Sequence, residues 1–246
     1  PSDKLIAEHG ADSIRYWATG ARLGQNLRFN TEEINKGKKT IMKLWNVAKF
    51  FSLYSTAQPI EPSLKLEPTD IWILTELNST IATTTKAFES YEYAKAREAI
   101  SNFFWSQLAD YYIEFIKYRL NGDDILSKQS ALSTLATVLQ TVLKLFAPIL
   151  PYITEEIYQH LFSLTPKESI HLSTWPQLVS FAPESALDDF SNAIAAIDEI
   201  RKYKSKNALS LGTSLPTYEL IQSVDLKKYG HFIQQVMRVE NLTIKE

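Results

Sequence analysis

The sequence predicts a mainly α-helical protein, an up-and-down bundle of long amphipathic helices with a small α/β appendage at its C-terminal end. Three observations support this fold class. Only 7 of the 246 residues are glycine, which favours long helices over tight turns. Successive long segments repeat apolar residues at helical spacing, as the helices of a bundle do. Beyond residue 182 the segments become shorter, and one has a partly alternating pattern typical of a strand.

The first thirty residues are predicted to form two short helices and a link. The elements are a helix over residues 2–10, a second one from Asp12 to about Gly20 or Gly24, and an extended link over residues 25–30. The chain begins at Pro1 without an initiator methionine and enters a helical pattern at once. We therefore expect it to be part of a longer protein.

Five helices are predicted for the bundle. They cover residues 31–55 with a cap at Asn30 or Thr31, a helix capped by Thr69 and Asp70, residues 91–120, a helix from Ser127 or Ser130 to Pro148, and residues 152–162. Each of the four long helices has a predicted core stripe. In chain order, the stripe of the first is Ile34, Ile41, Leu44, Trp45, Ala48 and Phe51, and that of the second is Ile71, Leu74, Leu77, Ile81 and Phe88. The stripe of the third is Phe104, Leu108, Tyr111, Phe115 and Tyr118, and that of the fourth is Leu135, Val138, Leu139, Val142, Leu145 and Phe146.

The appendage is predicted to alternate helices and strands. The expected order is a helix over 187–207, a strand over 214–221, a helix over 226–239 and a closing strand over 242–244. The first of these helices ends in a cluster of cations, Arg201, Lys202, Lys204 and Lys206. Cations near the negative end of a helix dipole are ordinary, so we interpret this cluster as structural.

The helix over residues 31–55 has a second face that burial explains poorly. It gathers Lys36, Lys39, Lys43, Asn46 and Phe50. Single-stranded RNA would suit such a face, because its phosphates bind lysines and its bases bind rings and amides. Two structural interpretations stay open: a lysine-rich face is usually only solvated surface, and the phenylalanine could pack on a neighbouring helix.

Charge and composition narrow the function further. Residues 1–50 contain nine Lys and Arg against five Asp and Glu, although the whole chain has a net charge of −2, so we expect a confined cationic patch. The absence of cysteine favours a reducing compartment, and no apolar run approaches the ~18 residues of a membrane span. The sequence has no glycine-rich phosphate loop, no Gly-x-Ser-x-Gly and no histidine pair at metal-binding spacing. We therefore expect a cytoplasmic, non-catalytic binding domain.

Several motifs resemble class I aminoacyl-tRNA synthetases. Residues 3–18, Asp-Lys-Leu-Ile-Ala-Glu-His-Gly-Ala-Asp-Ser-Ile-Arg-Tyr-Trp-Ala, resemble the segment after the Lys-Met-Ser-Lys-Ser loop of that family. Ala-Arg-Leu-Gly at 21–24 and Lys-Leu-Trp-Asn-Val-Ala-Lys-Phe at 43–50 are most similar to the valyl enzymes, and residues 200–211 are similar to a late segment of the same subfamily. Isoleucyl enzymes share some of these elements but usually differ at the Ala-Arg-Leu-Gly position.

The resemblance implies a domain plan without a catalytic centre. Residues 1–29 would be a stem-contact segment beside the catalytic domain, 30–176 the helical anticodon-binding domain, and 177–246 a small α/β ending. The family's His-Ile-Gly-His and Lys-Met-Ser-Lys-Ser motifs are absent. The resemblance therefore implies that no cofactor binds this part, and that ATP and Mg belong to the parent enzyme.

The resemblance also implies that this part recognises tRNA. Its expected partners are the anticodon loop and inner bend of tRNA-Val and the catalytic domain of the same chain. The implied roles are backbone phosphate contacts for Lys36, Lys39 and Lys43, with Lys49 as an additional one; a base-edge contact for Asn46; stacking for Phe50; and contacts to the inner bend of tRNA for Arg15 and Arg22. Two alternatives stay open: the same part of an isoleucyl enzyme, and a helical scaffold that docks proteins and never binds RNA.

Overall fold

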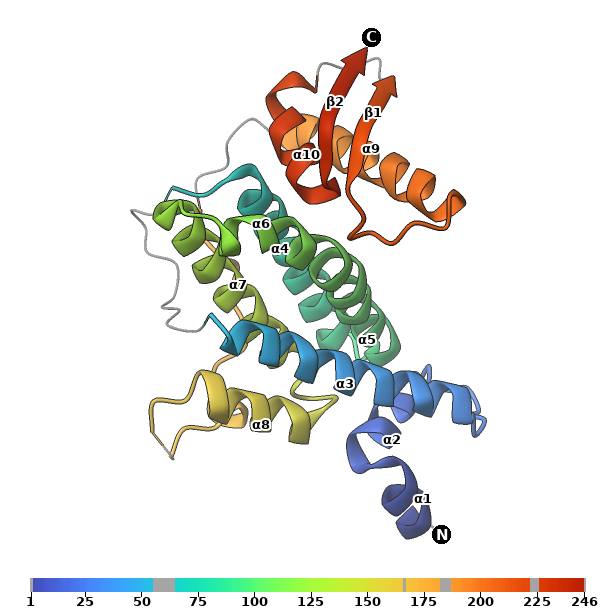
Figure 1. Cartoon of the computed structure of the whole chain (residues 1–246). Helices are drawn as coiled ribbons and strands as arrows, with labels where there is room; N and C mark the ends of the chain where they lie inside the picture. Colours follow the sequence, from blue (N-terminus) through green and yellow to red (C-terminus); the bar gives the residue numbers. More distant parts are fainter. Residues whose placement is uncertain (1, 55–64, 166, 182–186, 222–225, 246) are drawn as a thin grey trace.

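The computed structural model describes residues 2–54, 65–165, 167–181, 187–221 and 226–245. It is a helical bundle with a small α/β appendage at one end, which confirms the predicted fold class. In Figure 1 the appendage and the N-terminal helices lie at opposite ends of the molecule, and helix α3 crosses the bundle between them. None of the described helices is long and apolar enough to cross a bilayer.

The helical part contains two short and several long elements. They are α1 (Ser2–His9), α2 (Ala11–Ala18), α3 (Thr31–Ser52), α4 (Pro68–Glu89), α5 (Tyr93–Asn102), the π-helical segment η1 (Phe103–Tyr112), α6 (Ile113–Asn121), α7 (Ile125–Phe146), α8 (Pro151–Leu161) and the 3₁₀ turn η2 (Ile170–Leu172). The predicted helix over 91–120 is thus one continuous helical stretch, α5–η1–α6, with a widened middle.

Helix starts follow side-chain caps, and the structure corrects two of them. Asn30 Oδ1 accepts from the backbone N–H groups of Glu32 and Glu33, as the sequence predicts for α3. The predicted cap of the next helix at Thr69 or Asp70 is wrong, because α4 begins one residue earlier and its capping box starts at Glu67. Helix α7 likewise begins at Ile125 with an Asp124 cap, ahead of the predicted start at Ser127 or Ser130.

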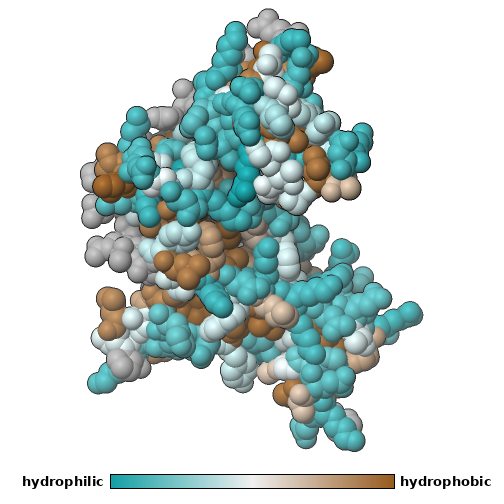
Figure 2. Space-filling model, in the orientation of Figure 1, coloured by the Kyte–Doolittle hydropathy of each residue, from teal (hydrophilic) through white to brown (hydrophobic). Residues whose placement is uncertain are grey.

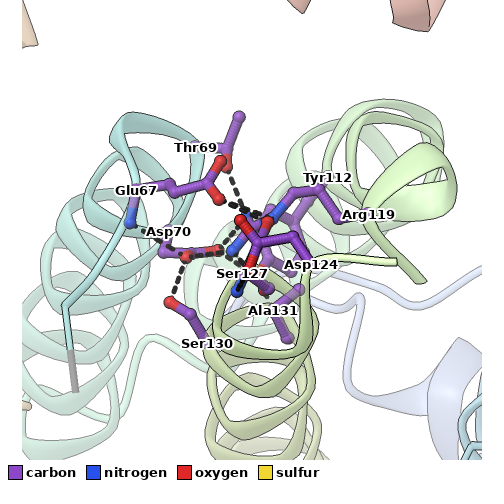
Figure 3. Close-up of polar contacts among 9 residues, drawn as sticks. All are labelled: Glu67, Thr69, Asp70, Tyr112, Arg119, Asp124, Ser127, Ser130 and Ala131. Atoms are coloured by element: carbon purple, nitrogen blue, oxygen red, sulfur yellow. Dashed lines mark hydrogen bonds and ion pairs between the residues drawn. The ribbon is translucent and has the colours of Figure 1, made fainter. Parts of the chain in front are cut away.

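The displaced cap residues lie in a buried polar network that joins α4, α6 and α7 (Figure 3). Arg119 on α6 is completely buried and forms a two-pronged ion pair with the buried Asp70 at 2.8 Å on each prong. Tyr112 and Ser130 donate to the same carboxylate at 2.8 and 2.7 Å. A carboxylate at a helix start is usually exposed. Asp70 is buried here because groups on η1, α6 and α7 form hydrogen bonds with its carboxylate.

The buried face of α3 is rotated from the predicted one. Trp45, predicted in the core, is 43% exposed, whereas Val47 is only 3% exposed. Helix α2 packs closely against α3 at Gly37, where an added Cβ would lie 3.0–3.1 Å from Tyr16 and Ser13. The buried face extends from Gly37 toward Val47, and Trp45 lies at its other, outer edge.

The appendage is a short β-α-β unit with one additional helix. Its elements are α9 (Leu187–Lys206), β1 (Leu215–Ile221), η3 (Lys227–Tyr229), α10 (Gly230–Met237) and β2 (Val239–Lys245). The two strands pair in parallel, from Leu215 opposite Val239 to Ile221 opposite Lys245. The predicted helix over 226–239 ends at Arg238, whose left-handed backbone (φ 52°) starts the second strand earlier than predicted.

Two hydrophobic cores meet at a cluster of aromatic rings. The larger core fills the bundle, and the smaller one lies between α9, α10 and the sheet. Phe115 of α6 belongs to the smaller core and contacts Phe232 of α10 at 5.3 Å between ring centroids. Trp72 of α4 packs against both cores and contacts Phe190 of α9. Such aromatic packing fixes the appendage to the end of the bundle.

Candidate nucleic-acid interface

Rings and cations alternate along the side of α3 that faces η1 and α6. Lys43 Nζ lies 5.6 Å from the centre of the Trp105 ring. About two turns further on, Phe50 meets Tyr54 edge to face, with 5.4 Å between ring centroids. Lys128 of α7 lies 5.9 Å from the Tyr54 ring. We call the surface formed by Lys43, Phe50, Tyr54, Trp105, Asn121 and Lys128 the α3 strip.

The residues of the α3 strip are held in place but not sealed. The Trp105 Nε1–H donates to Thr40 Oγ1 at 3.3 Å, and the Tyr54 hydroxyl donates to Asn121 Oδ1 at 3.5 Å. Asn121 is exposed, and the rings of Phe50, Tyr54 and Trp105 are half-buried. Each ring therefore has one side fixed by the protein and retains surface that a flat ligand can contact.

The predicted RNA-binding residues of α3 do not all lie on one face. Lys43 and Phe50 lie on the strip, whereas Lys39 and Asn46 are exposed on the outer ridge of the helix. Lys49 lies on the opposite flank, at a hollow of about 250 Å³ shared with Trp45 and α8. Together they form a band that wraps the exposed half of α3.

Lys36 is exposed and already has a partner. Its Nζ donates to Glu33 Oε1 one turn earlier. This hydrogen bond lowers the pKa of Glu33 and raises that of Lys36. Because the pair lies in solvent, screening keeps it weak, so a phosphate can replace the carboxylate.

Phe50 shows features of both interpretations made from the sequence. It packs against the bundle core, as the structural interpretation expects. It nevertheless keeps part of its surface exposed beside Tyr54, as stacking on a base requires. The two roles are compatible, because one edge of a ring can anchor it while a face binds a ligand.

Arg15 and Arg22 belong to another region of the molecule. Arg15 donates to the carbonyls of Ile149 and Pro148 at the turn between α7 and α8, and Arg22 is exposed beyond the end of α2. Neither arginine is among the residues that form the α3 strip: one donates to the α7–α8 turn and the other lies beyond α2.

Helix α2 is fastened to the bundle by polar groups. Asp12 accepts from the backbone N–H groups of Tyr152 and Ile153 at the start of α8. Burial raises the pKa of Asp12, and these two hydrogen bonds partly offset the increase. Arg97 of α5 donates to the Tyr16 carbonyl at 2.7 Å and lies over the Tyr16 ring. The orientation of the N-terminal helices against the bundle is thus specified by charged groups.

Four residues of the α3 strip were missed by the sequence analysis: Tyr54, Trp105, Asn121 and Lys128. The spacing of Phe50 and Tyr54, four residues apart in the helix predicted over 31–55, is a signal that could have revealed the ring pair. The other three come from η1, α6 and α7, and only tertiary packing brings them to α3. Within the described residues, no group of three or more His, Cys, Asp and Glu side chains is placed to hold a metal ion.

Figure 2 shows how polarity is distributed on one face of the molecule. Apolar side chains lie over the middle of the bundle, and hydrophilic ones cover the appendage and the N-terminal helices. Rings and cations adjoin on the α3 strip itself, where Lys43 lies over Trp105 and Lys128 over Tyr54. This arrangement matches what a single-stranded nucleic acid needs, a ring surface for bases beside cations for phosphates.

The family model and the relatives found by comparison all concern tRNA ligases. A family model described as the anticodon-binding domain of tRNA ligase matches residues 70–219. The chain is 39% identical over 227 residues to a valine–tRNA ligase of Ehrlichia ruminantium strain Gardel, covering 89% of this chain and 27% of the relative. It is 34% identical over 221 residues to a valine–tRNA ligase of Haloarcula marismortui, covering 89% and 24%. The chain thus spans about a quarter of the length of these curated relatives.

One solved structure has a similar fold. It is the ternary complex of Agrobacterium radiobacter K84 agnB2 LeuRS with tRNA and LeuAMS, with a TM-score of 0.57 and 16% sequence identity over 83% of this chain and 27% of that one. At this identity the likeness concerns the fold alone. Because the family model covers more than half of the residues, the chain belongs to the family of anticodon-binding domains of tRNA ligases.

Proposed function

We propose that this chain is the tRNA-recognition portion of a valine–tRNA ligase. It binds the anticodon loop of tRNA-Val on the α3 strip and the adjoining exposed half of α3. A catalytic domain elsewhere in the same longer protein performs the ATP-dependent aminoacylation. The observation that carries the proposal is the strip itself, where Lys43 lies over Trp105 and Phe50 pairs with Tyr54 in a family of anticodon-binding domains.

Each part of the surface has a role set by its chemistry. The ammonium groups of Lys36, Lys39 and Lys49 contact backbone phosphates, which are the same for every sequence. The amide of Asn46 binds a base edge, since an amide can donate and accept at once. Phe50 and Tyr54 stack on unpaired bases, and such stacking tolerates any base. Discrimination between tRNAs therefore depends on the amide more than on the cations or rings.

The rest of the molecule has supporting roles in the proposal. Arg15 and Arg22 lie toward the N-terminal helices and contact the inner bend of the tRNA, with Arg15 keeping its hydrogen bonds to the α7–α8 turn. This portion binds no cofactor of its own, and ATP and Mg bind the catalytic domain. The working compartment is the cytoplasm. The relatives named as valine–tRNA ligases support valine over isoleucine as the amino acid.

A footprinting experiment on residues 1–246 tests the proposal. Transcribed tRNA-Val is probed with and without the protein, and protection of the anticodon loop is expected. The Lys43→Ala/Asn46→Ala double variant should lose this protection. The control is Lys202→Ala/Asn207→Ala, which removes an exposed lysine of α9 and the exposed asparagine that follows the helix, and it should protect the loop as the wild type does. Circular dichroism verifies that both variants are folded.

Two results would overturn the proposal. One is wild-type protein that leaves the anticodon loop unprotected at low salt. The other is a Lys43→Ala/Asn46→Ala variant that is folded and protects the loop fully. Protection of tRNA-Ile equal to that of tRNA-Val would remove the valine assignment and keep the RNA-binding role.

A further inference from the structure

A polar cleft lies where the appendage meets the bundle. It has a volume of about 470 Å³ and is bounded by α6, the loop after α9 and the end of α10. Lys117 and Asn121 of α6 line one side, and Arg201 and Arg238 line the other. On the face shown in Figure 2, hydrophilic side chains gather where the appendage adjoins the bundle. The cleft thus has cations on both walls.

Arg201 is fixed in position and has an unused donor. Its guanidinium lies 4.6 Å from the centre of the Tyr111 ring, and its Nη2 donates to the Asp110 carbonyl at 2.9 Å. Within the described residues its Nε–H, which is buried, has no hydrogen-bond partner. The carboxylate of Asp198 is 3.9 Å away, at the limit of an ion pair.

Arg238 gives the cleft a charge that is not neutralised. It follows α10 with a left-handed backbone and donates from Nη1 to the Gly212 carbonyl at 3.0 Å. Its side chain is exposed, and among the described residues no carboxylate lies within ion-pair distance of it. Lys117, by contrast, pairs with Glu114 at 2.6 Å. The positive charge is therefore concentrated on the appendage side.

The cleft and the α3 strip share one residue. Asn121 lines the cleft, and its Oδ1 accepts from the hydroxyl of Tyr54, which in turn pairs with Phe50. A strand stacked on the rings of the strip can therefore continue past Asn121 into the cleft. In Figure 1 helix α6, which carries Asn121 at its end, lies between α3 and the appendage.

We propose that this cleft binds a backbone phosphate of the RNA strand whose neighbouring bases stack on the α3 strip. The appendage is then the second wall of the RNA site, and Arg238 and Arg201 are its phosphate ligands. Guanidinium groups suit this role because they donate to two oxygens of a phosphate at once. The inference rests on the proposed RNA-binding function and extends it to the α/β appendage.

The test compares Arg238→Gln with the wild-type chain. Affinity for the tRNA-Val anticodon stem-loop is measured at several salt concentrations. The variant should bind more weakly, and the slope of log K against log salt should become smaller by about 0.7, the value of one phosphate contact to a single strand. Lys202→Gln, an exposed cation of α9 outside the cleft, is the control and should leave the slope unchanged.

A second measurement identifies the phosphate. Each loop phosphate of the stem-loop is replaced in turn by a neutral methylphosphonate. One replacement should weaken binding to the wild type and have no effect on Arg238→Gln, because the same contact is already lost. Arg238 is exposed, so this variant is expected to fold, and thermal unfolding verifies it.

The outcomes separate the two proposals. If the wild type binds the stem-loop through Phe50 but Arg238→Gln keeps the full slope, the cleft is not a phosphate site and the strip remains. If no methylphosphonate position responds differently in the two proteins, the inference is also overturned. If the wild type binds no RNA at all, both proposals are wrong.

Discussion

The buried network around Arg119 and the exposed α3 strip use similar side chains for different ends. In the network every donor of Arg119 has a partner: Thr69, Asp70 and the carbonyl and hydroxyl of Ser127 (Figure 3). In the strip, the ammonium group of the half-buried Lys43 lies over the Trp105 ring. Burial and complete pairing produce a rigid joint, whereas exposure and unused donors leave groups for a ligand.

The two regions also differ in how their charged groups respond to their surroundings. Burial raises the pKa of Tyr112 well above its usual value, and the neighbouring Asp70 raises it further. Burial alone would lower the pKa of Arg119, but Asp70 more than offsets this effect and the pKa is raised. Tyr112 therefore stays neutral and Arg119 stays charged at any ordinary pH. The strip and the adjoining half of α3 instead depend on half-buried and exposed lysines, so their binding should vary with salt.

The largest expected effect is on the buried network. Arg119→Met should lower the free energy of unfolding by about 3–5 kcal/mol, because it leaves the Asp70 carboxylate buried without its counter-ion. Urea unfolding measures the change. Adding Asp70→Asn to the variant should recover part of the loss.

The same variant tests whether the two regions are independent. At a temperature where Arg119→Met is folded, its affinity for the anticodon stem-loop should equal that of the wild type. A variant as stable as the wild type would show that the network does not hold the bundle together. Reduced affinity of the folded variant would show that the two regions are coupled.

Local patterns predicted much of the fold. Apolar spacing identified the long helices and most of their buried residues, and Asn30 was one of the two residues predicted to cap α3. The errors arose where distant segments decide. Asp70 has the sequence of a helix cap, yet Arg119, 49 residues away, draws it into the interior. Trp45 has the spacing of a core residue, but the neighbouring helices cover α3 on the side of Val47 and leave Trp45 43% exposed.

The candidate site was partly predictable for the same reason. Exposure of Lys36, Lys39 and Asn46 follows from helical spacing alone and is confirmed. The contact of Lys43 with Trp105 depends on how η1 packs against α3, and no spacing within α3 contains that information. That these residues bind RNA stays a prediction.

A second stability effect concerns a cation that the sequence analysis placed among ordinary helix-end charges. Lys204 is completely buried, and its Nζ donates to the carbonyls of Leu211, Thr213 and Met237. The structural interpretation holds for this residue, but the reason is not the helix dipole: Lys204 connects α9 to the loop before β1 and to the end of α10. It resembles Arg119 in being fully paired but has only neutral partners.

Lys204→Met should therefore lower stability by less than the Arg119 variant, about 1–3 kcal/mol for carbonyls left without donors. Hydrogen exchange of the β1 and β2 amides should accelerate, because the appendage opens first. Lys202→Met, two residues earlier on the exposed side of α9, is the control and should leave exchange unchanged. Equal exchange rates in both variants would mean that Lys204 does not hold the appendage.

Phe50 is half-buried, so it can serve both as a core residue of the bundle and as a binding residue of the α3 strip. Phe50→Ala should weaken stem-loop binding by about 1–3 kcal/mol if the ring stacks on a base. Phe88→Ala removes another half-buried ring that packs against the same core at α4, and it should lower stability without changing affinity. If Phe50→Ala behaves like Phe88→Ala in both assays, Phe50 is a core residue only.

The smallest effect concerns the exposed pair of Glu33 and Lys36. The Lys36 hydrogen bond lowers the pKa of Glu33 in the folded chain. The hydrogen bond therefore contributes its full stability above the pKa that Glu33 has in the unfolded chain. This contribution is lost as the pH falls through the lower pKa that Glu33 has in the folded chain. The difference in stability between wild type and Glu33→Gln should be at most about 1 kcal/mol near neutral pH and should vanish in acid. Urea unfolding at a series of pH values measures it.

Salt distinguishes this pair from the buried one. High salt should remove the small contribution of Glu33 and leave the effect of Arg119→Met unchanged, since screening acts on exposed charges and far less on buried ones. Glu33→Gln should also tighten binding of the stem-loop at low salt, because it frees the Lys36 ammonium for a phosphate and removes a nearby negative charge. Unchanged or weaker binding would place Lys36 outside the RNA contact and confine the site to the α3 strip and the ridge beside it.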